Sequence, residues 1–169
     1  MNNVEWTPEW LTETIKLLRT HGSDTQFIEV KKAHGGYPGS LDATLSSFSN
    51  SSTGGIIICG LDENNDFAPV GVYDPADLEK TLGNKLRRGL KPPNTMESGT
   101  ILYEDAKIFV ATIPPLPPYE RPAYIGGKAY VRSGDGDHEM SRHETDLMVA
   151  QRTRTGFDEE PVEYTSLAD

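Results

Sequence analysis

Apolar residues recur at helical spacing in three segments of the chain, and each segment follows a typical N-cap residue. The spaced positions are Leu11, Ile15 and Leu18; Leu41, Leu45 and Phe48; and Leu78, Leu82 and Leu86. The N-cap signals are Thr7 before Pro8, Ser40, and Asp74 before Pro75. Ser141 and Glu144 have the spacing of a capping box that opens a further helix. The pattern therefore predicts four helices.

Shorter runs between these helices have the composition of β-strands. The predicted strands cover residues 26–32, 56–59, 70–73, 100–103, 107–113 and 128–132. In the first strand, Ile28 and Val30 share one face, while Phe27, Glu29 and Lys31 share the other. Residues 56–59 are all apolar, which is typical of a strand covered on both faces.

The connections between the predicted strands indicate the fold class. Residues 63–66 have turn chemistry, so we expect strands 56–59 and 70–73 to pair as a hairpin. Several other connections are too short for the crossovers of a strictly parallel sheet. The sequence predicts the α+β (mixed α/β) class, with a single compact domain whose mixed, hairpin-containing sheet is flanked by helices.

The chain has 169 residues, of which 36% are hydrophobic and 25% charged, and this suits one globular domain. We expect the domain to cover residues 1–152, followed by an acidic tail or linker at 153–169. No apolar run approaches the roughly 20 residues of a membrane span, and the first residues lack a signal-peptide pattern. With one cysteine, Cys59, a cytoplasmic protein is the simplest interpretation.

The formal net charge of −10 argues against simple electrostatic attraction to nucleic acid, but the charge is unevenly distributed. Residues 158–169 carry five acids and no base, which is half of the net charge. A local basic stretch contains Lys80, Lys85, Arg87, Arg88 and Lys91. It could follow a nucleic-acid backbone, or it could place cations at a helix end where the helix dipole favours them.

Three further charged positions allow two interpretations each. Arg132 ends a predicted strand before Ser133, where it could bind a phosphate or serve as the structural partner of an acid. Glu29 lies in one strand and Asp62 follows another, so the two could converge and hold a hard divalent metal. Alternatively, Glu29 pairs with neighbouring strands and Asp62 starts a turn.

Several short motifs occur in an order that resembles a known family. They are Glu29-x-Lys31, Asn50, Gly54-Gly55, Gly60-x-Asp62, Val70-Gly71, Pro122-x-Tyr124, Tyr130 to Gly134, and Met140-Ser141. Over residues 20–150 the chain resembles the Schlafen-type Alba-like (AlbA_2) domain found at the N-terminus of bacterial transcriptional-regulator-like proteins. The resemblance implies a domain that binds DNA or RNA, forms a homodimer and precedes downstream domains of a longer chain.

The same resemblance implies an alternative function. Family members that cleave RNA use three acids, which match Asp24, Glu29 and Asp62 here, with Lys31 beside them. The alternative is therefore an endoribonuclease whose three carboxylates hold Mg2+ or Mn2+ while Lys31 stabilises negative charge. Asp24 is shorter than the Glu usual in the family, and Val30 replaces the usual Phe. A third interpretation is a protein-interaction or oligomerisation module.

The nuclease interpretation requires a bend in the backbone before the first predicted strand. Asp24 and Glu29 are five positions apart, so they would face opposite ways on one straight strand. Their side chains can converge only if the chain bends near Gly22 and Ser23 or at Thr25.

Overall fold

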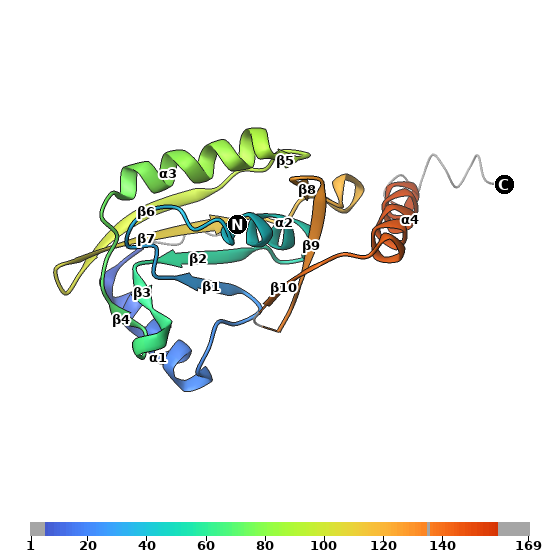
Figure 1. Cartoon of the computed structure of the whole chain (residues 1–169). Coiled ribbons are helices and arrows are strands. Elements are labelled where there is room, and N and C mark those ends of the chain that lie inside the picture. The colour runs from blue at the N-terminus through green and yellow to red at the C-terminus, as the bar shows by residue number, and fades with distance from the viewer. Residues whose placement is uncertain (1–5, 135, 159–169) are drawn as a thin grey trace.

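The computed structural model describes residues 6–134 and 136–158, and its centre is a four-stranded mixed sheet (Figure 1). The strand order is β1 (Ile28–Lys31), β2 (Gly55–Cys59), β7 (Ala106–Ile113) and β6 (Glu97–Tyr103). β1 and β2 run parallel, and the other neighbours run antiparallel. The parallel pair is joined by a crossover that contains helix α2 (Leu41–Asn50), because parallel strands cannot be joined by a tight turn.

Helices cover both faces of this sheet. Helix α1 (Pro8–His21) packs through Leu11, Ile15 and Leu18 on the face that carries Val30 and Ile58. Helices α2 and α3 (Pro75–Asn84) cover the opposite face, so α3 and α1 lie on opposite sides of the sheet in Figure 1. The continuous apolar sequence of β2 follows from this arrangement, since alternate side chains enter different cores.

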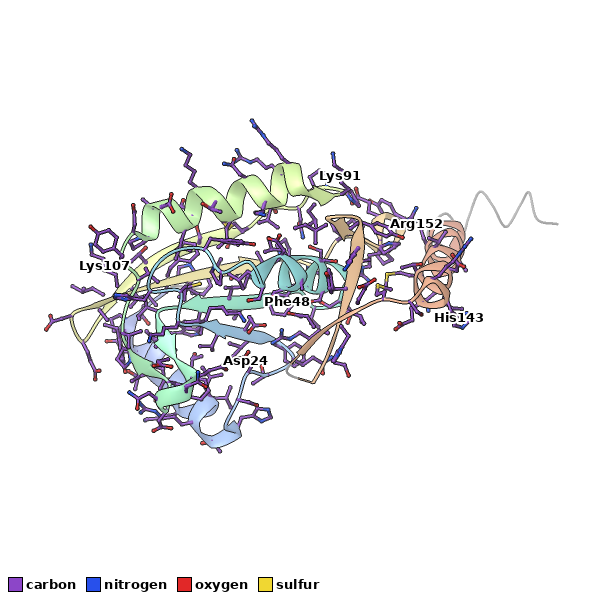
Figure 2. All side chains as sticks on the ribbon, in the orientation of Figure 1. Asp24, Phe48, Lys91, Lys107, His143 and Arg152 are labelled. Atoms are coloured by element: carbon purple, nitrogen blue, oxygen red, sulfur yellow. The ribbon has the colours of Figure 1, made fainter. Side chains whose placement is uncertain are left out.

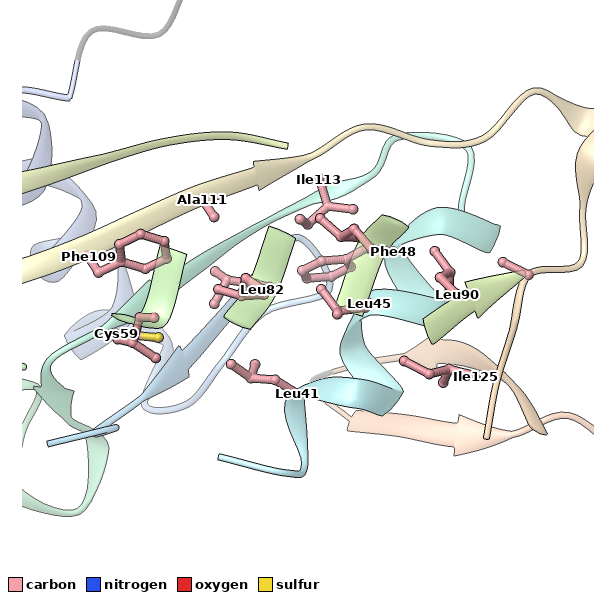
Figure 3. Packing of buried hydrophobic residues seen from close by; sticks show 14 of the residues in the cluster. Leu41, Leu45, Phe48, Cys59, Leu82, Leu90, Phe109, Ala111, Ile113 and Ile125 are labelled. Atoms are coloured by element: carbon pink, nitrogen blue, oxygen red, sulfur yellow. The ribbon is translucent and has the colours of Figure 1, made fainter. Parts of the chain in front are cut away.

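The core between α2, α3 and the sheet contains the largest buried side chains. Phe48 from α2, Leu82 from α3 and Phe109 from β7 meet in this layer, as Figure 3 shows. Each of the three is fully buried, and together they hold both helices on one face of the sheet. Burial of such side chains contributes about 2 kcal/mol each.

A second sheet lies on the other side of α2. Its order is β10 (Gly136–Glu139), β9 (Lys128–Ser133), β8 (Tyr124–Ile125) and β5 (Leu90–Lys91), all antiparallel. Polar side chains of α2 hold this sheet in place through hydrogen bonds. Ser46 accepts a hydrogen bond from the amide of Tyr130 (2.9 Å), and Asn50 accepts one from the amide of Ala123 (2.6 Å). These bonds explain why α2 buries serines and an asparagine.

The remaining elements are short, apart from the last helix. They are β3 (Leu61–Asp62), η1 (Glu63–Asn65), β4 (Ala68–Pro69), the π-helical turn η2 (Lys85–Gly89), η3 (Pro118–Glu120) and α4 (Arg142–Asp158). The capping box of α4 is present, because Ser141 and Glu144 each accept a hydrogen bond from the other's amide. No helix within the described ranges is long and apolar enough to cross a membrane.

The predicted α+β class and the four predicted helices are confirmed, but the predicted hairpin is wrong. β2 pairs with β1 and β7, and residues 70–73 form no strand. Gly60 has a φ of 113°, a conformation that favours glycine, and it turns the chain into the small β3–β4 ladder. Val70 and Gly71 then donate their amides to the carbonyl of Gly60, so residues 70–73 return beside the turn.

Two other differences concern the C-terminal third. Strand β10 was not predicted, because the glycines around residues 134–136 have the composition of a loop. Helix α4 continues past the proposed domain end at residue 152 to Asp158. The proposed tail at 153–169 mostly lies outside the described residues, so the domain boundaries stay a prediction.

Candidate functional site

The loop between α1 and β1 brings Asp24 and Glu29 together. Gly22 ends α1 with a φ of 85°, and the Thr25 hydroxyl then accepts the amides of Phe27 (3.1 Å) and Ile28 (3.0 Å). This turn folds Asp24 back along β1, so that its Oδ1 accepts the amide of Val30 at 3.0 Å. The bend that the sequence required at this place is therefore present, and Figure 2 shows Asp24 beside β1.

The surroundings of Asp24 favour its protonated form. Burial raises the pKa of this carboxyl to about 9, assisted by a hydrogen bond to Glu29 and by the charges of Glu29 and Glu63. The hydrogen bond from the Val30 amide opposes the shift but does not cancel it. In its protonated form the Asp24 carboxyl can donate a hydrogen bond to Glu29.

Arg132 is the main partner of Glu29. Its Nη1 lies 2.7 Å from Glu29 Oε1 and 3.1 Å from Asp137 Oδ1. Its Nη2 donates to the carbonyls of Thr25 (2.8 Å) and Ile28 (3.1 Å). The side chain is only 2% exposed, so the guanidinium is directed at acids and carbonyls rather than at a surface phosphate. Arg132 therefore occupies the structural role that the sequence left open as its alternative.

Hydroxyl groups of α2 complete this arrangement. Thr44 donates to Asp137 Oδ2 at 2.7 Å, and Ser47 donates to Asp137 Oδ1 at 2.5 Å. We call the set of Asp24, Glu29, Thr44, Ser47, Arg132 and Asp137 the Glu29–Arg132 network. It joins β1, α2, β9 and β10, which are far apart in the sequence. The sequence did not reveal Asp137, because β10 was not recognised as a strand.

Asp62 is not part of this network. The parallel register pairs Lys31 with Cys59, so the chain leaves β2 beside the end of β1 rather than beside its start. Asp62 Oδ2 lies 3.8 Å from Lys32 Nζ, and its Oδ1 accepts the amide of Asn64 as the cap of η1. Lys31 instead points to Glu29, with 3.8 Å between Nζ and Oε2.

The three carboxylates do not lie together as one group of ligands among the described residues, and their assignment as a metal site stays a prediction. Asp24 favours its protonated form, Glu29 is paired with Arg132, and Asp62 is paired with Lys32. In residues 6–134 and 136–158, no group of three or more His, Cys, Asp or Glu side chains is arranged to hold a metal ion. The structure unites Asp24, Glu29 and Lys31 and separates Asp62 from them.

The basic stretch forms a second candidate site on the surface. Leu78, Leu82 and Leu86 face the core, while Lys80 and Arg87, seven positions apart, lie on another side of α3 and η2. We call Lys80, Arg87, Arg88 and Lys91 the α3 basic surface. All four are exposed, and none makes an ion pair or a side-chain hydrogen bond within the part of the chain that the structure describes.

Lys85 differs from the other four predicted bases. Its Nζ lies 3.2 Å from Asp42 Oδ2 and 5.6 Å from the centre of the Tyr37 ring. The charge of Lys85 is therefore paired within the protein, and we do not include Lys85 in the α3 basic surface.

A groove adjoins the α3 basic surface, with a volume of about 650 Å³. It is lined by Ala76, Glu79, Lys80, Gly83, Asn84, Leu86, Arg87, Asn94, Thr95, Met96 and Ser98. We call it the α3 groove. Its second wall, residues 94–98, is fixed by Asn94, which donates to Ser49 Oγ (2.9 Å) and the Pro114 carbonyl (2.8 Å). Sequence reasoning missed this groove, because no pattern places residues 94–98 beside α3.

Comparisons with known proteins agree with this fold. The family model "Schlafen, AlbA_2" matches residues 24–141. The N-terminal domain of a RecG-related protein from Nitrosomonas europaea has a similar structure, with a TM-score of 0.59 and 23% identity over 78% of this chain and 95% of that one. The DIP2311 protein from Corynebacterium diphtheriae gives a TM-score of 0.52 and 14% identity over 83% of this chain.

Both identities are low, so these two likenesses concern the fold alone. This chain spans 28% of the length of the DIP2311 protein. No curated protein matches the sequence. The family model covers most of the chain, including the Glu29–Arg132 network and the α3 groove, and the chain therefore belongs to the Schlafen AlbA_2 family.

Proposed function

We propose that this domain binds nucleic acid through the α3 basic surface. The observation that carries the proposal is that Lys80, Arg87, Arg88 and Lys91 are exposed without acidic partners among the described residues. Membership of the AlbA_2 family and the fold shared with the N-terminal domain of a RecG-related protein support the same function. The finer hypothesis is a DNA-binding domain in a transcriptional-regulator-like protein.

The negative net charge does not oppose such binding at this place. Residues 85–96 contain four bases and no acid, although the whole chain has a net charge of −10. Charges separated by more than about 8 Å are largely screened at physiological salt, so a bound strand responds mainly to the nearest side chains. We expect modest affinity with a strong dependence on salt.

The helix dipole alone does not account for the basic surface. Arg87 and Arg88 lie in the last turn of η2, where the dipole favours cations. Lys80, however, lies in the middle of α3, and Lys91 lies in β5 beyond the helix. The four basic residues are thus supplied by three consecutive elements, and two of them, Lys80 and Arg87, line the α3 groove, as expected for contacts to a phosphate backbone.

The test neutralises three of these bases. The variant Arg87→Gln, Arg88→Gln, Lys91→Gln should bind a fluorescein-labelled oligonucleotide of about 15 nucleotides at least tenfold more weakly, measured by anisotropy at about 50 mM salt. The control is Lys16→Gln, Arg19→Gln, Lys107→Gln, which removes the same charge from α1 and from the end of the sheet farthest from Lys91 in Figure 2. Equal affinities for the two variants would contradict the proposal and favour a protein-interaction module.

The endoribonuclease interpretation stays a prediction, and the geometry does not favour it. Glu29 is buried, paired with Arg132 and hydrogen-bonded to Asp24, and Asp62 lies apart. The nuclease interpretation is tested by measuring RNA cleavage with Mn2+ by the parent chain and by Glu29→Gln. Asp66→Asn, which changes an exposed acid, is the control. Cleavage by the parent that Glu29→Gln abolishes would support the nuclease, whereas equal rates would reject it.

A further inference from the structure

We propose that the α3 groove accepts one unpaired base, so that the preferred nucleic acid of this domain is single-stranded. The inference rests on the proposed nucleic-acid binding and adds the class of ligand. It starts from a groove that is larger than a phosphate requires. The groove lies beside basic side chains that are expected to bind the phosphate backbone.

The size and the lining of the groove suit a nucleobase. Its volume of about 650 Å³ falls within the range of roughly 300–1,000 Å³ that is typical of small-molecule sites. Met96 and Ala76 supply apolar surface for the faces of a ring. Asn84, Thr95 and Ser98 line the same groove, and their side chains make no hydrogen bond to other described residues, so they remain free to pair with a base edge.

The charges in the groove favour a base over a phosphate inside it. Glu79 is the one acid among the described lining residues, and its carboxylate repels a phosphate but accepts a hydrogen bond from an exocyclic amino group. Lys80 and Arg87 also line the groove, and Arg88 and Lys91 are exposed close by in the chain. The phosphates on either side of an inserted base would therefore meet cations.

The groove is formed before any ligand binds. Asn94 donates its own amide to the Leu86 carbonyl (3.0 Å) and its side-chain amide to Ser49 and Pro114, so the second wall is anchored to α2 and to the chain after β7. The other wall contains the π-helical turn η2, a rare geometry that is frequent at functional sites. Only an unstacked base can enter such a groove, because a duplex keeps its bases paired.

Gly83 allows a direct test, because it lies in α3 at the wall of the groove. A Cβ atom added there meets only the methyl carbon of Met96 within 4 Å, at 3.9 Å. Gly83→Ala should therefore fold normally and leave the groove open, whereas Gly83→Leu should fill it without changing any charge. Asn84→Ala, at an exposed position, removes a polar group of the lining without a risk to folding.

The probes are a fluorescein-labelled single strand of about 15 nucleotides, the same sequence as a duplex, and the single strand with 2-aminopurine at one position. We expect the parent chain and Gly83→Ala to bind the single strand about tenfold more tightly than the duplex, with a change in 2-aminopurine fluorescence. Gly83→Leu should lose this preference and the fluorescence change while retaining the weaker duplex binding. Asn84→Ala should weaken single-strand binding alone.

The outcomes separate this inference from the proposed function. Equal binding of both probes by the parent chain, or single-strand binding by Gly83→Leu as tight as by Gly83→Ala, overturns base insertion and leaves nucleic-acid binding intact. Absence of binding to either probe at low salt overturns the proposed function, and base insertion fails with it.

Discussion

Buried charge is concentrated at Glu29 and Arg132, with the partly buried Asp137 beside them, and each of these residues has a partner. Taking ions out of water costs several kcal/mol, so their pairing limits a penalty rather than adding a large gain. The hydrogen bonds from Arg132 to the carbonyls of Thr25 and Ile28 tie the start of β1 to β9. At the scale of single residues, we therefore expect this arginine to determine stability.

Arg132→Met should lower the free energy of unfolding by about 3 kcal/mol, because it leaves Asp137 without a cation and buried Glu29 with only Lys31 at 3.8 Å. Urea unfolding followed by circular dichroism measures the change. The control is Lys128→Met on the same strand, whose ion pair with Glu139 is more than half exposed and should contribute less than about 1 kcal/mol. Similar losses in the two variants would show that the network is not stabilising.

The raised pKa of Asp24 predicts that the stability of the fold depends on pH. The pKa of Asp24 is about 9 in the folded chain and near 3.8 in the unfolded chain, so between these values the folded state holds one more proton. Its contribution to stability is therefore complete below about pH 4 and decreases as the pH rises toward 9. Asp24→Asn keeps a donor for Glu29 and an acceptor for Val30 but cannot ionise.

The free energy of unfolding of Asp24→Asn should exceed that of the parent chain increasingly from about pH 5 to about pH 8. Urea unfolding at several pH values measures this difference. Parallel pH profiles for the two proteins would mean that Asp24 is already ionised in the folded state.

At the scale of elements, the close approach of α2 to β2 determines the packing of the first sheet. A Cβ atom at Gly55 would lie 2.5 Å from the ring of Phe48, which is fully buried. Only glycine therefore allows this helix to lie so close to the strand. The motif Gly54-Gly55, noted in the sequence as part of a family pattern, thus has a steric reason at its second position.

Gly55→Ala should destabilise the fold by about 2 kcal/mol, because the added methyl would lie 2.5 Å from the ring of fully buried Phe48. Gly35→Ala is the matched control, since an added Cβ there meets nothing within 4 Å and the backbone does not require glycine. Thermal unfolding of both variants checks the prediction. A melting temperature for Gly55→Ala equal to that of Gly35→Ala would contradict it.

The elements also show which features the sequence could predict. Helices α1 and α3 followed from local spacing and side-chain caps, and α2 followed from spacing alone, because Ser40 makes no capping hydrogen bond. The partner of β2 depends on contacts far along the chain, so turn residues at 63–66 suggested a hairpin where the structure has a parallel pair. Asp24 and Glu29 are five positions apart, so a local turn brings them together, whereas the position of Asp62 depends on how β2 pairs with β1.

At the scale of the whole molecule, an acidic chain gathers four exposed bases in one place, the α3 basic surface. A homodimer could bring two such surfaces together, and this stays a prediction that light scattering can test.

The most direct test of nucleic-acid binding is the salt dependence of affinity for a single strand. Each phosphate contact contributes about 0.7 to the slope of log K against log salt concentration, so Arg87→Gln, Arg88→Gln, Lys91→Gln should reduce the slope by about 2. Lys16→Gln, Arg19→Gln, Lys107→Gln should leave the slope unchanged. An unaltered slope in the first variant would show that these side chains do not contact phosphates and would contradict the proposed function.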